Sequence, residues 1–241
     1  MKQKTFIASG CSFTFEDWCW PTPVAEHYDM NLINVGMGSQ DNALISKKAI
    51  YQVDKLLKEG TNPDDIFVGI MWSGIDRYSF FTEDTTQRVN TNGWLQNPTA
   101  INGNLENAHW IILNGHWETR EAKSFYGNIS TTPGMIIRTI QHILFTQWYL
   151  EKNNIKYFMT TFMNILNQHP GWLNHFDIRY LYDMIDQSKF IDVIGEYEWV
   201  ASQCNGEFFC TDKFHPNATG HSLFAKEIII PFIDETYGKI L

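Results

Sequence analysis

Basic side chains are a minority in this 241-residue sequence, which carries 18 Lys and Arg against 27 Asp and Glu and a formal charge of −9. Neutralising a nucleic acid or an anionic membrane needs a positive field, so the sequence favours neither as a partner. Long apolar runs are also missing. The most apolar stretch, residues 228–233, is interrupted by Pro231, whereas a membrane-spanning helix needs about 20 apolar residues, so we expect no membrane span.

Cysteine is rare as well. The four thiols are Cys11, Cys19, Cys204 and Cys210, a density too low for a disulfide framework, and we expect them to be reduced. Only residues 6–8 could form the apolar centre of a secretory signal, which needs about 7 residues or more. The sequence therefore predicts a protein that stays in the cytoplasm.

Apolar side chains, by contrast, are plentiful at 44%, and aromatic ones reach 15%, enough for a large core. Strand-like and helix-like segments alternate along most of the chain, a pattern typical of a parallel sheet covered by helices on both faces. The expected strands are residues 5–8, 31–35, 66–71 and 155–160, and the clearest helices are residues 42–57 and a helix from Thr132 to about 152. We predict an α/β fold, a three-layer α/β/α sandwich with a mostly parallel sheet, in a single domain over residues 1–241.

Residues 78–130 break this alternation, because the segment is rich in Asn, Gly and Trp and shows no sustained period. We expect an irregular insertion over the edge of the sheet, of the kind that often forms a lid or a binding loop. Its tryptophans, Trp94, Trp110 and Trp117, either stack on a ligand such as a sugar or pack the insertion onto the core.

The strongest chemical signal lies near the C-terminal end, where Asp212 and His215 precede Pro216 and an apolar helical stripe. Proline suits the first turn of a helix because it has no N–H to leave unsatisfied there, so we expect both side chains on the loop that enters the last helix. At a separation of three residues, the carboxylate can reach Nδ1 of the imidazole and leave Nε2 to accept a proton. An isolated pair of this kind is more often a helix-end charge and a surface histidine.

A partner for that base lies at the other end of the chain. Ser12 follows the first predicted strand in the segment Gly-Cys-Ser-Phe-Thr, residues 10–14, and groups at the carboxyl ends of parallel strands face the crevice where ligands bind. By itself such a serine often only caps a helix. Cys11 is an alternative nucleophile, but adjacent side chains in an extended turn diverge, so we expect Ser12 and not Cys11 to face His215.

Together these two segments resemble the SGNH, or GDSL-type, hydrolase superfamily, which has a Gly-Asp-Ser-Leu-like block after its first strand and an Asp-x-x-His block before its last helix. Residues 10–14 are similar to the first block, with Cys where Asp is common, and residues 212–215 match the last. The resemblance implies Ser12 as nucleophile, His215 as general base and Asp212 as the carboxylate that orients it.

Two further blocks of that superfamily concern the oxyanion hole. The resemblance implies a glycine after the second strand, for which Gly38 is preferred to Gly36. The Gly-x-Asn-Asp block is only partly matched by Trp-Ser-Gly-Ile-Asp-Arg, residues 72–77, where Ile stands at the position of the Asn that donates to the oxyanion. The candidates to replace that donor are Ser73, which is the nearest, Asn42 and Asn164.

Other constellations are weaker. The gaps between His169, His175 and Asp177 suit no helical or hairpin metal site, and Cys204 and Cys210 lack the spacing of a zinc knuckle. No glycine-rich phosphate-binding loop follows any predicted strand. We therefore expect no metal and no cofactor.

The sequence as a whole predicts a serine esterase that hydrolyses a carboxylic ester of a small molecule or a glycan through an acyl-enzyme. The Asn and Trp residues of the insertion make a carbohydrate O-deacetylase the preferred case. Two alternatives remain open: an O-acyltransferase, and a non-catalytic glycan-binding or assembly protein that has lost an oxyanion donor. An α/β-hydrolase fold is less favoured, because its nucleophile lies mid-chain on a Gly-x-Ser-x-Gly turn.

Overall fold

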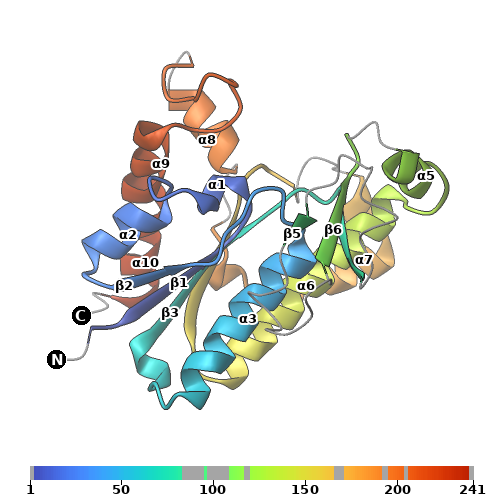
Figure 1. Ribbon diagram of the computed structural model, residues 1–241. Coiled ribbons are helices and arrows are strands. Elements are labelled where there is room, and N and C mark those ends of the chain that lie inside the picture. The colour runs from blue at the N-terminus through green and yellow to red at the C-terminus, as the bar shows by residue number, and fades with distance from the viewer. Residues whose placement is uncertain are drawn as a thin grey trace.

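A four-stranded parallel sheet lies at the centre of the computed structural model (Figure 1). Its strands, in spatial order, are β2 (Asn31–Asn34), β1 (Thr5–Ser9), β3 (Ile66–Trp72) and β7 (Lys156–Thr161). β3 is buried at every residue, which explains why it reads as a continuous apolar run without alternation. The structure describes residues 3–82, 95–96, 109–116, 120–165, 171–191, 195–203 and 206–238.

The register of this sheet brings the carboxyl ends of its strands to one edge. Ser9 at the end of β1 pairs with Ile70, and Trp72 at the end of β3 pairs with Thr161. The loops that follow β1, β2, β3 and β7 therefore emerge side by side. In open parallel sheets, ligands bind at this edge.

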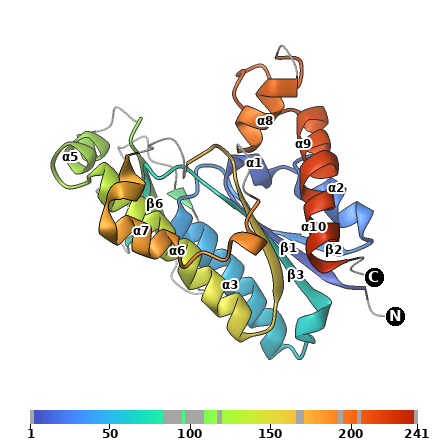
Figure 2. The ribbon, with the colours of Figure 1, turned by 180° about the vertical axis from the view of Figure 1, so that it is seen from behind.

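Helices cover both faces of the sheet (Figure 1, Figure 2). One face is covered by α3 (Asn42–Lys58) and α6 (Thr132–Lys152), which also pack on each other. The other face is covered by α2 (Pro21–His27), α9 (Ala218–Phe224), the π-helical turn η4 (Ala225–Ile229) and α10 (Ile230–Tyr237). The predicted α/β class and its three layers are thus confirmed.

Shorter helical segments connect these layers. They are α1 (Ser12–Phe15), α7 (Phe176–Tyr182), α8 (Glu196–Gln203) and the 3-10 turns η1 (Pro63–Asp65), η2 (Trp172–Asn174) and η3 (Gln187–Lys189). The two long helices begin at side-chain caps, as helix starts usually do. Asp41 accepts the N–H of Leu44 at the start of α3, and Thr131, one residue before the expected Thr132, accepts the N–H of Gly134 at the start of α6.

The prediction of an irregular segment at residues 78–130 is wrong in the part that the structure describes. β4 (Arg77–Thr82), β6 (His109–Asn114) and β5 (Leu95–Gln96) form an antiparallel sheet in that order, and α5 (Arg120–Asn128) follows. Both faces of β6 are covered, since Ile112 packs with Leu44 of α3 while Leu113 packs with Ala122 of α5. A strand buried on both faces lacks the period-two pattern that would reveal it in the sequence.

The last helical run begins later than expected. Pro216 lies before it, in an isolated bridge with Phe209. The N-cap of α9 is Asn217, whose Oδ1 accepts the N–H groups of Thr219 and Gly220 at 3.0 and 3.1 Å. An Asn cap satisfies these N–H groups, so proline is not needed in the first turn.

Candidate active site

The loop after β1 carries Ser12. Cys11 is the N-cap of α1, so that Ser12 is the first residue of this one-turn helix. A Cβ at Gly10 would lie 2.1 Å from Thr14 Oγ1 and 3.1 Å from Met71 O, so glycine allows the Thr14 side chain to pack this closely on the loop. Cys11 is fully buried in the core, whereas Ser12 is part-exposed.

Ser12 contacts His215, although 203 positions separate them along the chain. Ser12 Oγ lies 2.8 Å from His215 Nε2, and His215 Nδ1 lies 2.5 Å from Asp212 Oδ2. A carboxylate at Nδ1 favours the tautomer with the proton on that nitrogen, which turns the lone pair of Nε2 toward the hydroxyl. The structure thus brings together the three side chains that the sequence singled out and leaves Cys11 in the core.

A tight turn holds Asp212 in place. Its Oδ1 accepts the N–H groups of Phe214 at 2.9 Å and of His215 at 3.0 Å, and its Oδ2 faces the imidazole. Lys213, within the turn, has a φ of +58°, a left-handed conformation that is unfavourable for most residues with a side chain. Burial by itself would raise the pKa of Asp212, but these hydrogen bonds outweigh it and lower the pKa to about 2. The carboxylate is therefore ionised at neutral pH.

Aromatic rings pack against the imidazole. The ring centroids of Phe13 and Phe214 lie 5.0 and 5.2 Å from that of His215, and Phe162 lies 5.0 Å from Phe13. This apolar packing restricts rotation of the imidazole and keeps its Nε2 directed at Ser12.

The loop after β2 contains the two candidate glycines. The N–H of Gly36 donates to Asn34 Oδ1 at 2.9 Å, so this donor is already used within the protein. A Cβ at Gly38 would meet no atom within 4 Å, which places position 38 beside open space. The next residue, Ser39, has a φ of +63°. A ligand therefore has room to approach position 38, whereas a Cβ at Gly36 would lie 2.9 Å from the side chain of Thr14.

The loop after β3 delivers Ser73, which is fully buried and paired with Asn42. Ser73 N–H donates to Asn42 Oδ1 at 2.7 Å, and Asn42 Nδ2 donates to Ser73 O at 3.1 Å and to Thr139 Oγ1 at 3.2 Å. The Ser73 N–H and the Asn42 amide are therefore already used. Among the described residues, the Ser73 hydroxyl has no hydrogen-bond partner. Asn164, the third candidate, follows β7, and its N–H donates to Glu198 at 3.1 Å.

Gln40 links these loops and was not identified from the sequence. It is fully buried, and its Nε2 donates to Gly10 O at 2.7 Å and to Val35 O at 3.3 Å. The backbone carbonyl of Gln40 accepts from Arg77 Nη1 at 3.3 Å. The only sequence signal is its place between the glycine loop and the cap residue Asp41, and that does not distinguish a buried amide from a surface one.

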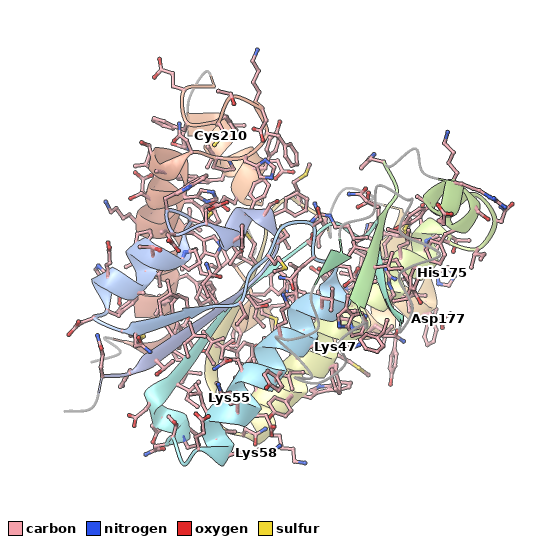
Figure 3. The ribbon with its side chains drawn as sticks, in the orientation of Figure 1. Lys47, Lys55, Lys58, His175, Asp177 and Cys210 are labelled. Atoms are coloured by element: carbon pink, nitrogen blue, oxygen red, sulfur yellow. The ribbon has the colours of Figure 1, made fainter. Side chains whose placement is uncertain are left out.

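Of the three tryptophans expected either to stack on a sugar or to pack onto the core, the structure describes Trp110. Trp110 is buried, and Lys47, labelled in Figure 3, lies over its ring with Nζ 4.0 Å from the centroid. Trp94 and Trp117 lie outside the described residues. Trp110 therefore has the second of the two expected roles, which is packing.

Of the weaker constellations, the His175–Asp177 pair lies apart from the site, whereas Cys210 borders it, because its N–H donates to His215 O at 2.8 Å. His175 Nδ1 and Asp177 Oδ2 are 3.9 Å apart at an exposed end of α7, well away from Cys210 (Figure 3). His169 and Cys204 lie outside the described residues, and the other three cysteines are free thiols. In the described ranges no group of three or more His, Cys, Asp or Glu is placed to hold a metal, and no helix there has the length and apolar character to span a membrane.

Comparisons with known proteins agree with the fold. The structure is similar to the psychrotrophic esterase EstA from Pseudoalteromonas sp., inhibited by monoethylphosphonate, with a TM-score of 0.51 and 10% identity over 97% of this chain and 98% of that one. It is also similar to a lipolytic protein of the G-D-S-L family from Desulfitobacterium hafniense DCB-2, with a TM-score of 0.47 and 13% identity over 99% of this chain and 100% of that one. At 10% identity the likeness to the esterase shows the fold alone.

The family is shown by a different comparison. No curated protein matches the sequence, but a family model matches residues 8–239. The chain belongs to that family, DUF6071, which is described as a family of unknown function.

Proposed function

We propose that this protein is a serine ester hydrolase in which Ser12 is acylated and His215 acts as general base. One observation carries the proposal: a continuous chain of contacts from Ser12 Oγ through the imidazole to Asp212, with distances of 2.8 and 2.5 Å, at the edge of the sheet where ligands bind. The similarity of the fold to that of an esterase supports the hydrolase class.

Each proton in the proposed reaction moves through His215. Its Nε2 takes the proton of Ser12 as the serine oxygen bonds to the ester carbonyl carbon, and the ionised Asp212 stabilises the imidazolium. When the bond between that carbon and the alcohol oxygen breaks, the imidazolium gives its proton to the departing alcohol. Water then attacks the acyl group while His215 takes its proton, and Ser12 leaves with that proton as the acid is released.

Three donors are proposed for the negative charge that develops on the carbonyl oxygen. The Ser12 N–H is at the first position of α1, where an N–H has no acceptor within the helix. The second is Gly38, because a Cβ there would meet no atom within 4 Å and a ligand has room to approach. The third is the Ser73 hydroxyl, which is fully buried and without a partner among the described residues, so the loop after β3 has to shift for it to reach the substrate. Removing one such donor commonly lowers turnover by about 100- to 1,000-fold, so Ser73→Ala is expected to reduce kcat by that factor.

Carbohydrate O-deacetylation is the finer proposal. Phe15, three positions after the nucleophile, is 45% exposed, and exposed aromatic faces pack well on sugar rings. Phe15→Ala should raise KM for acetylated oligosaccharides and leave KM for p-nitrophenyl acetate unchanged. Equal effects on both substrates would contradict the assignment. Adding an acceptor alcohol and identifying the product separates hydrolysis from acyl transfer.

The test of the reaction class is the hydrolysis of p-nitrophenyl acetate by wild type, Ser12→Ala and Cys11→Ala. Loss of the nucleophile is expected to lower kcat by about 1,000-fold or more, while Cys11→Ala should stay within severalfold of wild type because Cys11 does not face the base. Equal rates for wild type and Ser12→Ala would contradict the proposal and favour the non-catalytic binding protein.

A further inference from the structure

A second acid–base pair, which the proposed reaction does not use, lies close to the site. His221 Nδ1 is 2.5 Å from Glu196 Oε1, and the two side chains are 1% and 0% exposed. The second polar atom of each, Glu196 Oε2 and His221 Nε2, is buried without a hydrogen-bond partner in the part of the chain described. Apolar residues of similar volume are often at least as stable as such a buried pair, so stability alone does not account for it.

The sheet holds the Glu196 end of this pair. Glu196 is the first residue of α8, and a Cβ at the preceding Gly195 would lie 2.4 Å from the backbone of Met163. The N–H of Tyr197 donates to Phe162 O at 2.8 Å. Met163 and Phe162 directly follow β7, so the position of the carboxylate is set by the end of a central strand.

The His221 end belongs to α9, the helix that follows the His215 loop. The N–H of Asn217 donates to Phe208 O at 2.8 Å, and a Cβ at Gly220 would lie only 2.6 Å from the same carbonyl. The first turn of α9 is thus packed tightly on the chain that leaves α8. The Glu196–His221 contact joins α8 to α9, and the His215 loop is the part of the chain that connects these two helices.

His221 also contacts the nucleophile segment, residues 12–18, which carries Ser12. Its ring centroid lies 6.2 Å from that of Phe13, edge to face, and 5.4 Å from that of Trp18. Phe13 directly follows Ser12, and its ring also lies 5.0 Å from that of His215. The buried imidazole therefore touches the nucleophile segment while its own helix continues from the loop of the base.

We propose that Glu196 and His221 are positioning residues that set the distance between Ser12 Oγ and His215 Nε2. This inference rests on the proposed function. The sheet fixes Glu196, Glu196 fixes His221, and His221 holds the start of α9 against the nucleophile segment. Because a misplacement of about 1 Å can cost about 100-fold in rate, small shifts of this pair alter turnover without altering the substrate pocket.

The test is a double-mutant cycle of Glu196→Gln and His221→Gln with p-nitrophenyl acetate as substrate. Each single change is expected to lower kcat by about 10- to 100-fold and to change KM by about threefold or less. The double variant should be no slower than the worse single variant, because the two residues act as one unit. Single variants that keep the wild-type kcat, or effects that multiply in the double variant, would overturn the proposal.

Ser46→Ala is the matched control. It breaks another buried side-chain pair, Ser46 Oγ with Thr146 Oγ1 at 2.7 Å, between α3 and α6. It should lose stability in urea as the Glu196 and His221 variants do, but retain kcat. If Ser46→Ala lowers kcat equally, the loss reflects general destabilisation and the positioning role is excluded.

Two outcomes separate this inference from the proposed function. A folded wild type that neither hydrolyses the ester nor reacts with a fluorophosphonate removes the proposed function and this inference with it. An active wild type with unaffected variants removes only the inference.

If the Glu196 and His221 variants do not fold, Trp18→Leu, which alters the contact of His221 with the segment that carries Ser12, is the deciding variant. Trp18 is 40% exposed, so this change leaves no buried charge unpaired. It is expected to lower kcat by about three- to tenfold without changing KM. An unchanged kcat overturns the proposal.

Discussion

Replacing Asn42 by alanine removes the side chain that holds Ser73 at the end of β3. Its amide makes three hydrogen bonds, two with the Ser73 backbone and one with Thr139 Oγ1, and the three residues are at most 4% exposed. A buried N–H or C=O left unpaired costs about 1–3 kcal/mol. The Thr139 hydroxyl only accepts from the Asn42 amide and can still donate elsewhere, so the N–H and C=O of Ser73 are the two groups left unpaired. The free energy of unfolding is therefore expected to fall by about 2–6 kcal/mol.

The assay is unfolding in urea followed by the fluorescence of the nine tryptophans, with the m-value required to stay constant. Asn62→Ala is the matched control, because Asn62 is an exposed cap whose Oδ1 accepts the N–H of Asp64 at 3.1 Å. Its loss should be about 1 kcal/mol or less. If Asn42→Ala costs no more than Asn62→Ala, the reasoning is refuted, since the Ser73 backbone would then have found other partners.

Three further changes test the energetics of the fold and the site. Gly195→Ala places a Cβ 2.4 Å from the backbone of Met163 and should lower the free energy of unfolding by about 3 kcal/mol or more. Gly127→Ala, with nothing within 4 Å, should be neutral or stabilising by up to about 1 kcal/mol. Similar values for the two variants would contradict the close packing of Gly195 on Met163. Burial lowers the pKa of Lys48 to about 8, so Lys48→Met should stabilise the fold by up to about 3 kcal/mol at pH 7. This gain should shrink between about pH 8 and 10.5, where Lys48 is protonated in the unfolded state but not in the folded state. Lys55→Met, at an exposed position, should show no such effect. Asp212→Asn should lower kcat by about 1,000-fold or more. Because the folded-state pKa of Asp212 is lowered to about 2, its contribution to stability is present above about pH 4 and is lost as the pH falls toward 2. A wild-type advantage in urea that persists at pH 2 would argue against these hydrogen bonds to the carboxylate.

The parts of the fold that follow from short-range patterns are predictable from the sequence. The buried strands β1, β3 and β7 are short apolar runs between turn residues, and α3 shows its apolar side chains at helical spacing. Ser12 directly follows a strand, and Asp212 and His215 lie three positions apart, so the direction of each side chain is set within a few residues. The topology of a parallel sheet places Ser12 at the edge where ligands bind, and the resemblance to the SGNH superfamily implied that His215 meets it there.

The remaining features depend on contacts between distant segments. β6 is hidden because one of its faces packs on α3 and the other on α5. Gln40 and Glu196 are a Gln and a Glu with no distinctive neighbours in the sequence, and they differ from surface residues only in what folds over them. Burial of this kind is a property of the complete tertiary structure, so one sequence does not reveal it.

The most direct test of the proposed nucleophile is labelling of the folded protein with a fluorophosphonate, followed by peptide mass spectrometry. A serine activated by His215 should form one phosphonyl adduct on Ser12, and the adduct should be absent in Ser12→Ala and slow to form in Asp212→Asn. Folded wild-type protein that stays unlabelled, or that carries the adduct on another residue, would contradict the assignment of Ser12 as nucleophile.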